Sequence, residues 1–419
     1  MFKLNSLQQY AKAQMKSGKN IFLTGGAGVG KSAIINDYIS EYDPSEIMIC
    51  APTGIAALNI NGVTCHRAFK MPVKPLVEKP KVLPSALKDV KTVIIDEISM
   101  LRIDAFEYIA FIISSINLKR QKSGEKPIQL IVVGDFFQLP PVITDNDRNV
   151  LSQFRYGDGL RSGFAFQSKF WEYLNFEKIE LTEVIRQTNR EFSGYLNEAR
   201  IGNPYSIQYF NNMSNAYEID DAILLCATNK KVNDKNDTEL AKIKSKEFVF
   251  NAKITGTVNE SDKLVPDELK LKVGCRVMTV INDNVDGFYQ NGTLATVKEI
   301  YKDRVFIETD DGIKCDVFKY TWEIKSYSGK ENKSGKMELK EDIIGTYTQF
   351  PLRLGYAITI HKSQGKTFDK VNLDPYCWDF GQLYVALSRV KTISGLHLTQ
   401  PIRRNNLVCS DDVRQFYNL

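Results

Sequence analysis

Short, largely apolar runs alternate with helical patterns along about the first 190 residues. Four of these runs are typical of buried parallel strands: Asn20–Thr24, Ile47–Ala51, Thr92–Glu97 and Ile128–Asp135. Helical stretches lie between them, and one covers Ala105–Arg120. This alternation predicts a doubly wound α/β domain, in which helices cover both faces of a parallel sheet.

The segment Met71–Lys91 interrupts this alternation. Its prolines exclude a regular helix, and its lysines make it basic. The prolines are Pro72, Pro75, Pro80 and Pro84, and the lysines are Lys74, Lys79, Lys81, Lys88 and Lys91. We interpret residues 70–91 as a small insertion in the first domain, with an exposed linker as the alternative.

A second α/β block is predicted to begin near Ala222–Asn229 and to resume near Pro351. Between them the pattern changes to short β-type runs with turns at Asp303 and at Asp310–Gly312, which predicts a small antiparallel barrel. Ser326–Lys336 is interpreted as a flexible hairpin tip or loop. We expect residues 1–190 to form the first domain, 191–255 and 346–419 the second, and 256–345 the inserted barrel.

The composition excludes several classes of protein. Hydrophobic residues make up 43% and charged residues 25% of the 419 residues, which excludes a mainly disordered chain. No apolar run reaches the ~18 residues that cross a bilayer, and the first residues lack the apolar core of a signal peptide. The seven cysteines form no CxxC pair and only three histidines are present, so we expect a cytoplasmic protein with reduced thiols and no zinc. The net charge of +5 permits a nucleic-acid partner without requiring one.

A nucleotide-binding motif follows the first predicted strand. The sequence GGAGVGKS fits the pattern G-x-x-x-x-G-K-[ST]. Its backbone N–H groups can surround phosphate oxygens, while Lys31 reaches the β- and γ-phosphates and Ser32 ligates Mg²⁺. The alternative is a glycine turn between a strand and a helix. The residues assigned to nucleotide binding here are Gly25, Gly26, Ala27, Gly28, Val29, Gly30, Lys31 and Ser32.

Two adjacent carboxylates, Asp96 and Glu97, follow the third predicted strand. Asp96 is expected to hold the metal, and Glu97 is expected to polarise the attacking water as a general base. The alternative is a solvated strand end. Together with the glycine-rich loop, this pair predicts an NTPase, although it does not say what hydrolysis drives.

Further segments narrow the class. Gln138, within GDFFQLPPV, follows the fourth strand and could sense a γ-phosphate. Arg186, and Arg389 on an expected helix, have the chemistry of arginine fingers that reach the γ-phosphate from another domain. For each arginine the alternative is a surface ion pair. The segment Ala357–Asp369, AITIHKSQGKTFD, combines hydroxyls, a histidine, two lysines and a glycine.

In this order the segments resemble the superfamily 1 helicases, and in detail the Pif family of the RecD-like group. The motifs APTGIAA, DEIS, GDFFQLPPV, TIHKSQG and YVALSR carry the resemblance, which covers nearly the whole chain. It implies two RecA-like P-loop NTPase domains, with a small wedge insertion in the first and an SH3-like β-barrel in the second. The implied activity is that of an ATP-dependent DNA helicase that uses ATP and Mg²⁺.

The resemblance also implies roles for individual residues. Gln8 would read the adenine ring, with a surface helix position as the alternative. Lys31 would act on the phosphates, and Asp96 and Glu97 would perform the metal and base roles. The residues that would couple the γ-phosphate to domain closure are Gln138, Arg186, Gly365 and Arg389.

Single-stranded DNA and its junctions with duplex DNA are the implied partners, and no membrane is. The candidate DNA contacts are Thr53, His66, Phe69, Pro140, Thr359, His361, Lys362 and Ser363, with a structural role as the alternative for each. The resemblance implies 5′→3′ translocation and unwinding of forks, R-loops or G-quadruplexes in replication, repair, recombination or telomere maintenance. It also implies a protein that is monomeric without DNA.

The sequence departs from the family pattern at a few positions. Cys65 and Arg67 flank His66 where the family more often has Ile and Ser, and Tyr356 replaces a frequent Trp. These changes leave catalysis intact but put details of DNA contact in question. Three other functions remain alternatives: a superfamily 2 RNA helicase, a non-motor P-loop enzyme such as a small-molecule kinase, and an ATP-gated nucleic-acid clamp.

Overall fold

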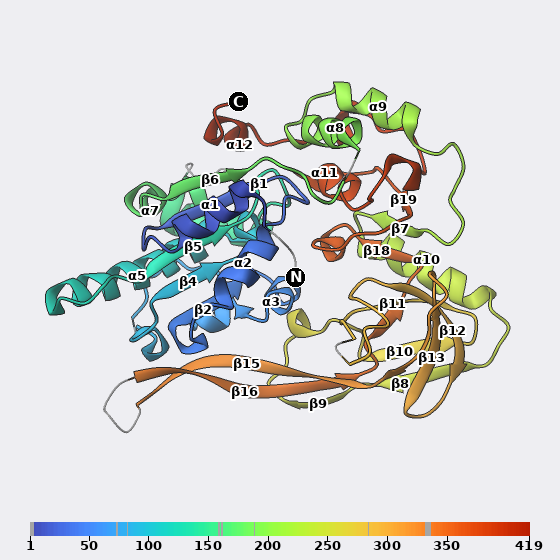
Figure 1. Ribbon diagram of the computed structural model, residues 1–419, viewed down its shortest axis with the longest axis horizontal. Helices are drawn as coiled ribbons and strands as arrows, with labels where there is room; N and C mark the ends of the chain where they lie inside the picture. The colour runs from blue at the N-terminus through green and yellow to red at the C-terminus, as the bar shows by residue number, and fades with distance from the viewer. Residues whose placement is uncertain are drawn as a thin grey trace.

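The protein consists of two parallel sheets with their helices and a group of antiparallel sheets. The computed structural model describes residues 4–72, 74–81, 83–157, 160, 162–187, 189–283, 285–331 and 337–419. Figure 1 shows the first parallel sheet at the left, the second at the upper right and the antiparallel sheets at the lower right and along the bottom. The α/β class that the sequence predicted is confirmed.

The first sheet has six strands in the order β3-β2-β4-β5-β1-β6, and all of its pairs are parallel. Its central strands are buried along their whole length, as the apolar runs predicted. The strands are β1 Ile21–Gly25, β2 Ile47–Ala51, β3 Val63–Thr64, β4 Thr92–Ile95, β5 Gln129–Val133 and β6 Glu177–Leu181.

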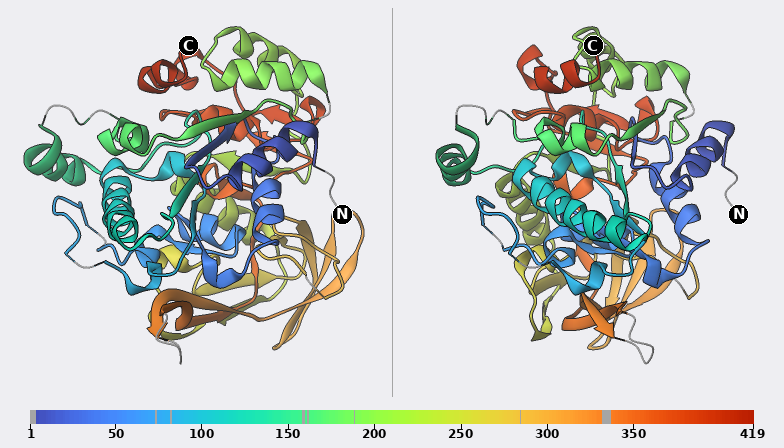
Figure 2. Two further views of the ribbon diagram at one scale, coloured as in Figure 1. Left: turned by 60° about the vertical axis from the view of Figure 1, so that its left-hand side comes forward. Right: turned by 90° about the vertical axis from the view of Figure 1, so that its left-hand side faces the viewer.

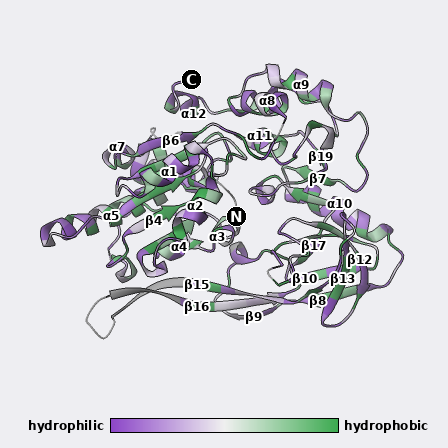
Figure 3. Ribbon diagram, in the orientation of Figure 1, coloured by the Kyte–Doolittle hydropathy of each residue, from purple (hydrophilic) through white to green (hydrophobic). Residues whose placement is uncertain are grey.

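Seven helices accompany the first sheet in the described part of the chain. They are α1 Ser6–Met15, α2 Lys31–Ile39, α3 Gly54–Asn59, α4 Cys65–Ala68, α5 Ile103–Ser123, α6 Asp145–Leu151 and α7 Lys169–Tyr173. Helix α5 ends at Gly124, whose φ of 76° closes the last turn. Its far end is hydrophilic, whereas the sheet beneath its first turns is hydrophobic (Figure 3).

The second parallel sheet has the order β18-β7-β19-β20. Its strands are β7 Ile223–Cys226, β18 Ala357–Thr359, β19 Val371–Leu373 and β20 Leu396–Leu398. The helices packed with it are α8 Arg190–Arg200, α9 Tyr205–Met213, α10 Asn229–Lys242 and α11 Gln382–Leu387. Arg389 lies two residues past the end of α11, so the prediction that it sits on a helix is wrong.

The antiparallel sheets, here called the insert, lie between β7 and β18 in the sequence. The strands are β8 Glu247–Asn251, β9 Lys253–Gly256, β10 Glu268–Lys272, β11 Arg276–Thr279, β12 Leu294–Ile300, β13 Arg304–Thr309, β14 Lys314–Phe318, β15 Tyr320–Glu331, β16 Met337–Gln349 and β17 Leu352–Leu354. They form sheets β14-β13-β12-β11-β17, β15-β16-β9 and β10-β8. The insert therefore extends beyond the expected 256–345 at both ends.

Strands β15 and β16 form a long hairpin that leaves the rest of the insert and runs along the first domain (Figures 1 and 2). The expected hairpin tip, Ser326–Lys336, falls partly on these strands, and residues 332–336 lie outside the described residues. The hairpin lies against α4 and against a short 3₁₀ turn at Ser85–Leu87. In the described residues of Met71–Lys91 that turn is the only helical element, in agreement with the prolines.

Helix α12, Asp411–Phe416, returns to the first domain. Phe416 stacks on Phe166 with ring centroids 4.4 Å apart, and Val413 and Tyr417 belong to the core of the first sheet. The expected second domain, 346–419, thus includes a helix that packs elsewhere, because its aromatic side chains complete the first domain's core. No helix among the described residues is long and apolar enough to cross a membrane.

Candidate nucleotide site and nucleic-acid interface

The glycine-rich loop lies between β1 and α2, as the motif predicted. Gly25, Gly28 and Gly30 all have positive φ values, of 136°, 80° and 86°, which let the loop turn tightly over the start of α2. The Lys31 ammonium donates to the carbonyl oxygens of Gly25 (2.7 Å) and Gly26 (3.0 Å). Burial lowers the pKa of Lys31, although Asp135 and Glu97 oppose that shift. The lysine is therefore held at the loop where phosphates would bind.

Gln8 is buried against this loop. Its Nε2 donates to the carbonyl of Val29 (3.0 Å), and its Oε1 accepts from the N–H of Asn5 (3.0 Å) as half of a capping box for α1. A Cβ on Gly30 would approach Gln8 Nε2 to 2.5 Å, so the two segments fit closely. The structure brings Gln8 to the nucleotide loop, with both ends of its amide engaged by the protein.

Asp96 and Glu97 follow β4 and face Lys31. Asp96 accepts a hydrogen bond from the N–H of Glu97 (2.9 Å). Burial and the neighbouring Asp96 raise the pKa of Glu97 to about 7, and burial also raises the pKa of Asp96. Glu97 has a φ of 52°, an uncommon backbone conformation for a residue with a side chain. A carboxyl with a pKa near neutrality suits a general base.

The two predicted arginine fingers come together at the edge of the second domain. Arg389 is 2% exposed and donates through Nε to the carbonyl of Val385 (2.8 Å) and through Nη2 to Ser388 Oγ (2.7 Å). Arg186 donates to the carbonyl of Ser388 (3.3 Å). Burial and the positive charge of Arg186 lower the pKa of Arg389 to about 9. The surface ion pair that was the alternative for Arg389 is excluded by its burial.

Three residues that sequence reasoning missed join the two domains at this site. Asp135, fully buried after β5, accepts from Arg200 Nε (3.0 Å) and Nη2 (2.9 Å), across from α8. The Tyr384 hydroxyl accepts from the N–H of Ala27 in the glycine-rich loop (2.7 Å). Asp135 and Tyr384 lie inside motifs that the sequence displays, GDFFQLPPV and YVALSR, whereas Arg200 has no motif signal.

A cavity of about 510 Å³ connects the expected metal site to the second domain. Ser32, Asp96 and Glu97 line it from the first domain, and Gly365 lines it from the second. Gln138 does not line this cavity. It is buried, and its backbone carbonyl oxygen lies against Gly381. Mg²⁺ is usually held by one or two carboxylates together with substrate phosphates, so Ser32 and Asp96 fit that ion. No cluster of three or more His, Cys, Asp or Glu side chains suited to a metal occurs in the described residues.

The candidate DNA contacts divide into accessible and inaccessible groups. Thr53, His66, His361 and Lys362 are partly exposed, and burial lowers the pKa of both histidines. Phe69 is 1% exposed within the core of the first domain, so its ring is covered here and its contact with DNA stays a prediction. The buried candidates are Pro140, Thr359 and Ser363. DNA contact by these three residues stays a prediction, with a structural role as the alternative.

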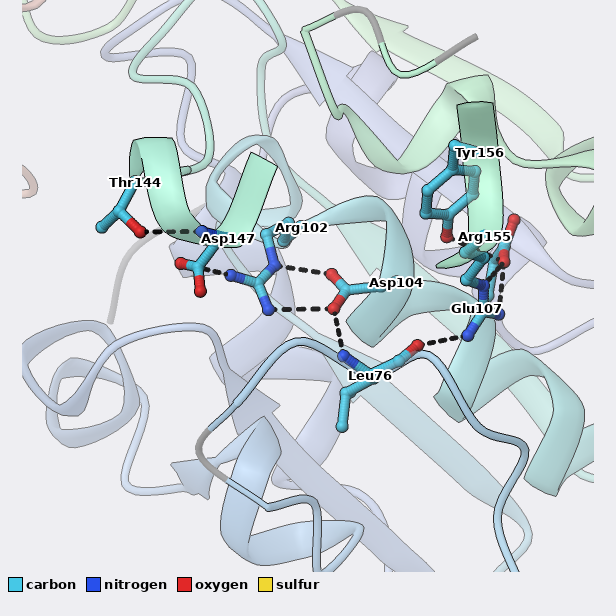
Figure 4. Close-up of polar contacts among 8 residues, drawn as sticks. All are labelled: Leu76, Arg102, Asp104, Glu107, Thr144, Asp147, Arg155 and Tyr156. Atoms are coloured by element: carbon cyan, nitrogen blue, oxygen red, sulfur yellow. Dashed lines mark hydrogen bonds and ion pairs between the residues drawn. The ribbon is translucent and has the colours of Figure 1, made fainter. Parts of the chain in front are cut away.

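Both backbone polar groups of Leu76 bind side chains outside the insertion at residues 70–91 (Figure 4). The N–H of Leu76 donates to Asp104 Oδ2 (2.8 Å), and the Leu76 carbonyl accepts from Arg155. Arg102 binds Asp104 bidentately (2.6 and 2.9 Å), and Glu107 binds Arg155 (2.5 Å). The polar network therefore holds the peptide units on both sides of the Leu76 Cα.

Comparison with known proteins decides the family. Residues 5–206 match the family described as PIF1-like helicase. The ATP-dependent DNA helicase Pif1 of Campylobacter jejuni is 34% identical, in an alignment of 411 residues that covers 88% of this chain and 86% of that protein. The chain belongs to the Pif1 helicase family. The predictions of a Pif-family protein and of an ATP-dependent DNA helicase are thereby confirmed.

Solved Pif1 structures share the fold over the whole chain. Bacteroides Pif1 with ADP-AlF4 is 31% identical, covers 100% of this chain and 97% of its own, and gives a TM-score of 0.82. Unliganded Bacteroides Pif1 also gives 0.82, whereas the same helicase bound to single-stranded DNA gives 0.69. The arrangement of this chain is thus more similar to the Pif1 structures without DNA. The parallel sheets are RecA-like, as predicted.

Proposed function

We propose that this helicase translocates on single-stranded DNA in the 5′→3′ direction and unwinds forked duplexes, with ATP hydrolysed between its two RecA-like sheets. One observation carries the proposal. The nucleotide site takes Lys31, Asp96 and Glu97 from the first domain, while Arg200, Tyr384 and Arg389 approach from the second. A nucleotide bound there contacts both domains, so its hydrolysis changes how they sit together.

The proposed chemistry begins with Lys31. Its ammonium exchanges the carbonyls of Gly25 and Gly26 for phosphate oxygens, and the loop N–H groups hold the remaining phosphates. Glu97, once ionised, accepts a proton from the attacking water. Mg²⁺, held by Ser32 and Asp96, would neutralise phosphate charge.

Arg389 and Arg186 are proposed to act when the domains close. The Arg389 guanidinium is bonded only to groups of its own domain, and its repulsion by Arg186 favours an anionic partner. The γ-phosphate supplies that partner, so ATP favours closure and hydrolysis removes the attraction. Repeated closing and opening of the cleft moves the DNA-binding surfaces of the two domains relative to each other.

The DNA substrate is proposed from the relatives. Bacteroides Pif1 has been solved with single-stranded DNA, and another structure describes unwinding at forked double-stranded DNA by two coordinating Pif1 helicases. We extend these partners to this chain, with G-quadruplexes and R-loops as further substrates in replication, repair or recombination. The segment 70–91 is proposed as the wedge that separates the strands.

The decisive experiment compares duplexes that carry only a 5′ or only a 3′ single-stranded tail. Unwinding of the 5′-tailed duplex alone is expected, and unwinding confined to the 3′-tailed duplex would overturn the direction. ATPase rates with and without single-stranded DNA provide the companion measurement. Absence of stimulation would favour a non-motor ATPase, and full unwinding by Lys31→Ala, despite lost hydrolysis, would favour an ATP-gated clamp.

A further inference from the structure

The second domain places a tyrosine hydroxyl on the glycine-rich loop of the first domain. Tyr384, on α11, is 3% exposed, and its hydroxyl oxygen accepts a hydrogen bond from the Ala27 N–H (2.7 Å). A Cβ on Gly26 would lie 3.3 Å from that oxygen and 3.6 Å from Asn197 Oδ1, on α8. The second domain therefore packs closely on the loop, and a side chain at position 26 would crowd this contact.

The Ala27 N–H belongs to the part of the loop that is expected to bind phosphate. In a motif of this type the backbone N–H groups surround the phosphate oxygens of a nucleotide. Lys31, from the same motif, donates to the carbonyl oxygens of Gly25 and Gly26. Two donors that are expected to bind phosphate therefore have oxygen atoms of the protein as their partners.

A phosphate oxygen is a stronger acceptor for this N–H than the tyrosine hydroxyl. Burial raises the pKa of the Tyr384 phenol further above neutrality, so its oxygen carries no charge. A hydrogen bond to an ionised oxygen is about twice as strong as one between neutral groups. Because one N–H does not donate strongly to two oxygens at once, the hydroxyl has to leave Ala27 before a phosphate binds there.

We propose that the Tyr384 hydroxyl competes with a nucleotide phosphate for the Ala27 N–H, so that the second domain sets the nucleotide affinity of the first. This inference rests on the function proposed above, in which the loop binds the nucleotide. It gives Tyr384 a role opposite to that of Arg389, since the arginine attracts the phosphate and the tyrosine opposes its binding. Nucleotide binding and the position of α11 are then coupled, and each changes the other by the same factor.

The test is the nucleotide affinity of Tyr384→Phe without DNA, measured with mant-ADP and with a fluorescent, non-hydrolysable ATP analogue. Phe keeps the buried ring but removes the competing oxygen, so the Ala27 N–H has no partner until a phosphate binds. The dissociation constant should fall about two- to tenfold, as expected for one hydrogen bond. A fall for both nucleotides identifies a phosphate that ADP carries, and a fall for the ATP analogue alone identifies the γ-phosphate. Unchanged constants would overturn the proposal, as would raised ones, which would mean that the hydroxyl itself binds the phosphate.

Two comparisons separate competition from a structural role. The matched control, Tyr347→Phe, removes another buried hydroxyl, which donates to the Val265 carbonyl in the insert (2.8 Å), and should leave both constants unchanged. Without nucleotide, Tyr384→Phe should melt below the wild type, and this difference in Tm should shrink at a saturating concentration of the ATP analogue. A difference that the analogue does not reduce would make the hydroxyl structural and overturn the proposal. A wild type that binds neither nucleotide would instead contradict the proposed function itself.

Discussion

Glu97 has an uncommon backbone conformation and a buried carboxyl whose ionised form is unfavourable. Its φ of 52° and its pKa of about 7 both arise at the end of β4, beside Asp96. The backbone conformation and the ionised form of the buried carboxyl both lower the free energy of unfolding, and active sites are where such strain is concentrated. The consequences of this residue should therefore be visible in both catalysis and stability.

The DNA-stimulated ATPase rate should rise with pH across the neutral range. A general base acts only when ionised, and a pKa of about 7 means that the ionised fraction of Glu97 grows between about pH 6 and about pH 8. Steady-state kcat measured across that range checks this expectation. A flat profile would assign proton removal to another group.

The same shift predicts an effect on stability. Folding raises the pKa of Glu97 from its ordinary value of 4.5 to about 7, so the neutral carboxyl favours the folded state. This contribution to the free energy of unfolding is complete below pH 4.5 and is lost as pH rises through about 7. Glu97→Gln should therefore increase the free energy of unfolding at about pH 8, by at most about 3 kcal/mol, and much less at about pH 5. Urea unfolding at both pH values tests the sign.

Arg389→Ala should separate ATP binding from turnover. Among the described residues the side chain donates hydrogen bonds to groups of its own domain, so binding of a fluorescent ATP analogue should change little, while kcat should fall by about 10³ or more, as for other arginine fingers. Arg403→Ala, at an exposed arginine of the same region, is the matched control. Normal turnover in Arg389→Ala would remove the finger assignment.

At the scale of elements, the segment 70–91 depends on side chains far from it in sequence. Glu107 accepts from Arg155, from the Tyr156 hydroxyl (2.9 Å) and from Ser168 Oγ (2.9 Å), and Arg155 in turn holds the Leu76 carbonyl (Figure 4). The Glu107 and Arg155 side chains are 13% and 19% exposed, so removing one leaves a largely covered charge without its partner. The orientation of residues 70–91 therefore depends on the contact between Glu107 of α5 and Arg155.

Glu107→Gln should uncouple unwinding from ATP hydrolysis. Loss of its charge frees Arg155 and loosens the Leu76 peptide, so the rate of duplex unwinding should fall about tenfold, equivalent to about 1.4 kcal/mol. DNA-stimulated ATPase should stay within about twofold, since the nucleotide site is untouched. Stopped-flow unwinding is the measurement, and Glu125→Gln, on the exposed loop after α5, is the control. Equal losses in both activities would contradict a wedge role.

Local patterns predicted the elements whose causes are local. The apolar run at residues 47–51 forms β2 with the predicted bounds. The glycine-rich loop could be predicted because the glycines that allow its positive φ values lie close together in the sequence. The pairing of Asp135 with Arg200 spans 65 positions, so no local pattern could reveal it. The burial of Phe69 could not be predicted for a similar reason, since periodicity does not distinguish a core ring from an exposed one.

At the scale of the molecule, an ion pair between described residues connects the insert to the first domain. Arg67 on α4 binds Asp262, whose side chain is 3% exposed, and both line a cavity of about 330 Å³ that β15 also lines. The pair belongs to the arrangement that is more similar to Pif1 without DNA. It should therefore oppose any movement of the insert that accompanies DNA binding.

Arg67→Asp should favour the arrangement seen in DNA-bound relatives. The measurement is fluorescence energy transfer, without DNA, between one dye on the first domain and one on the insert. The transfer efficiency of Arg67→Asp should differ from that of the wild type, because the insert has lost this contact with the first domain. Combining Arg67→Asp with Asp262→Arg should restore the contact and the original transfer efficiency. If the single variant keeps the wild-type efficiency, the pair does not hold the insert.

Helix α12 forms a second connection between the two motor domains, because it continues the chain of the second domain and packs on the first. The chain leaves the first domain after β6, builds the second, and then returns at residues 411–417 to the aromatic core around Trp171, where the Tyr417 hydroxyl bonds Thr24 Oγ1 (2.8 Å). A body attached at one point can turn in any direction, whereas two attachments confine it to rotation about the line between them. The nucleotide then has only one angle to control, and little of its free energy is lost to motions that do not move DNA.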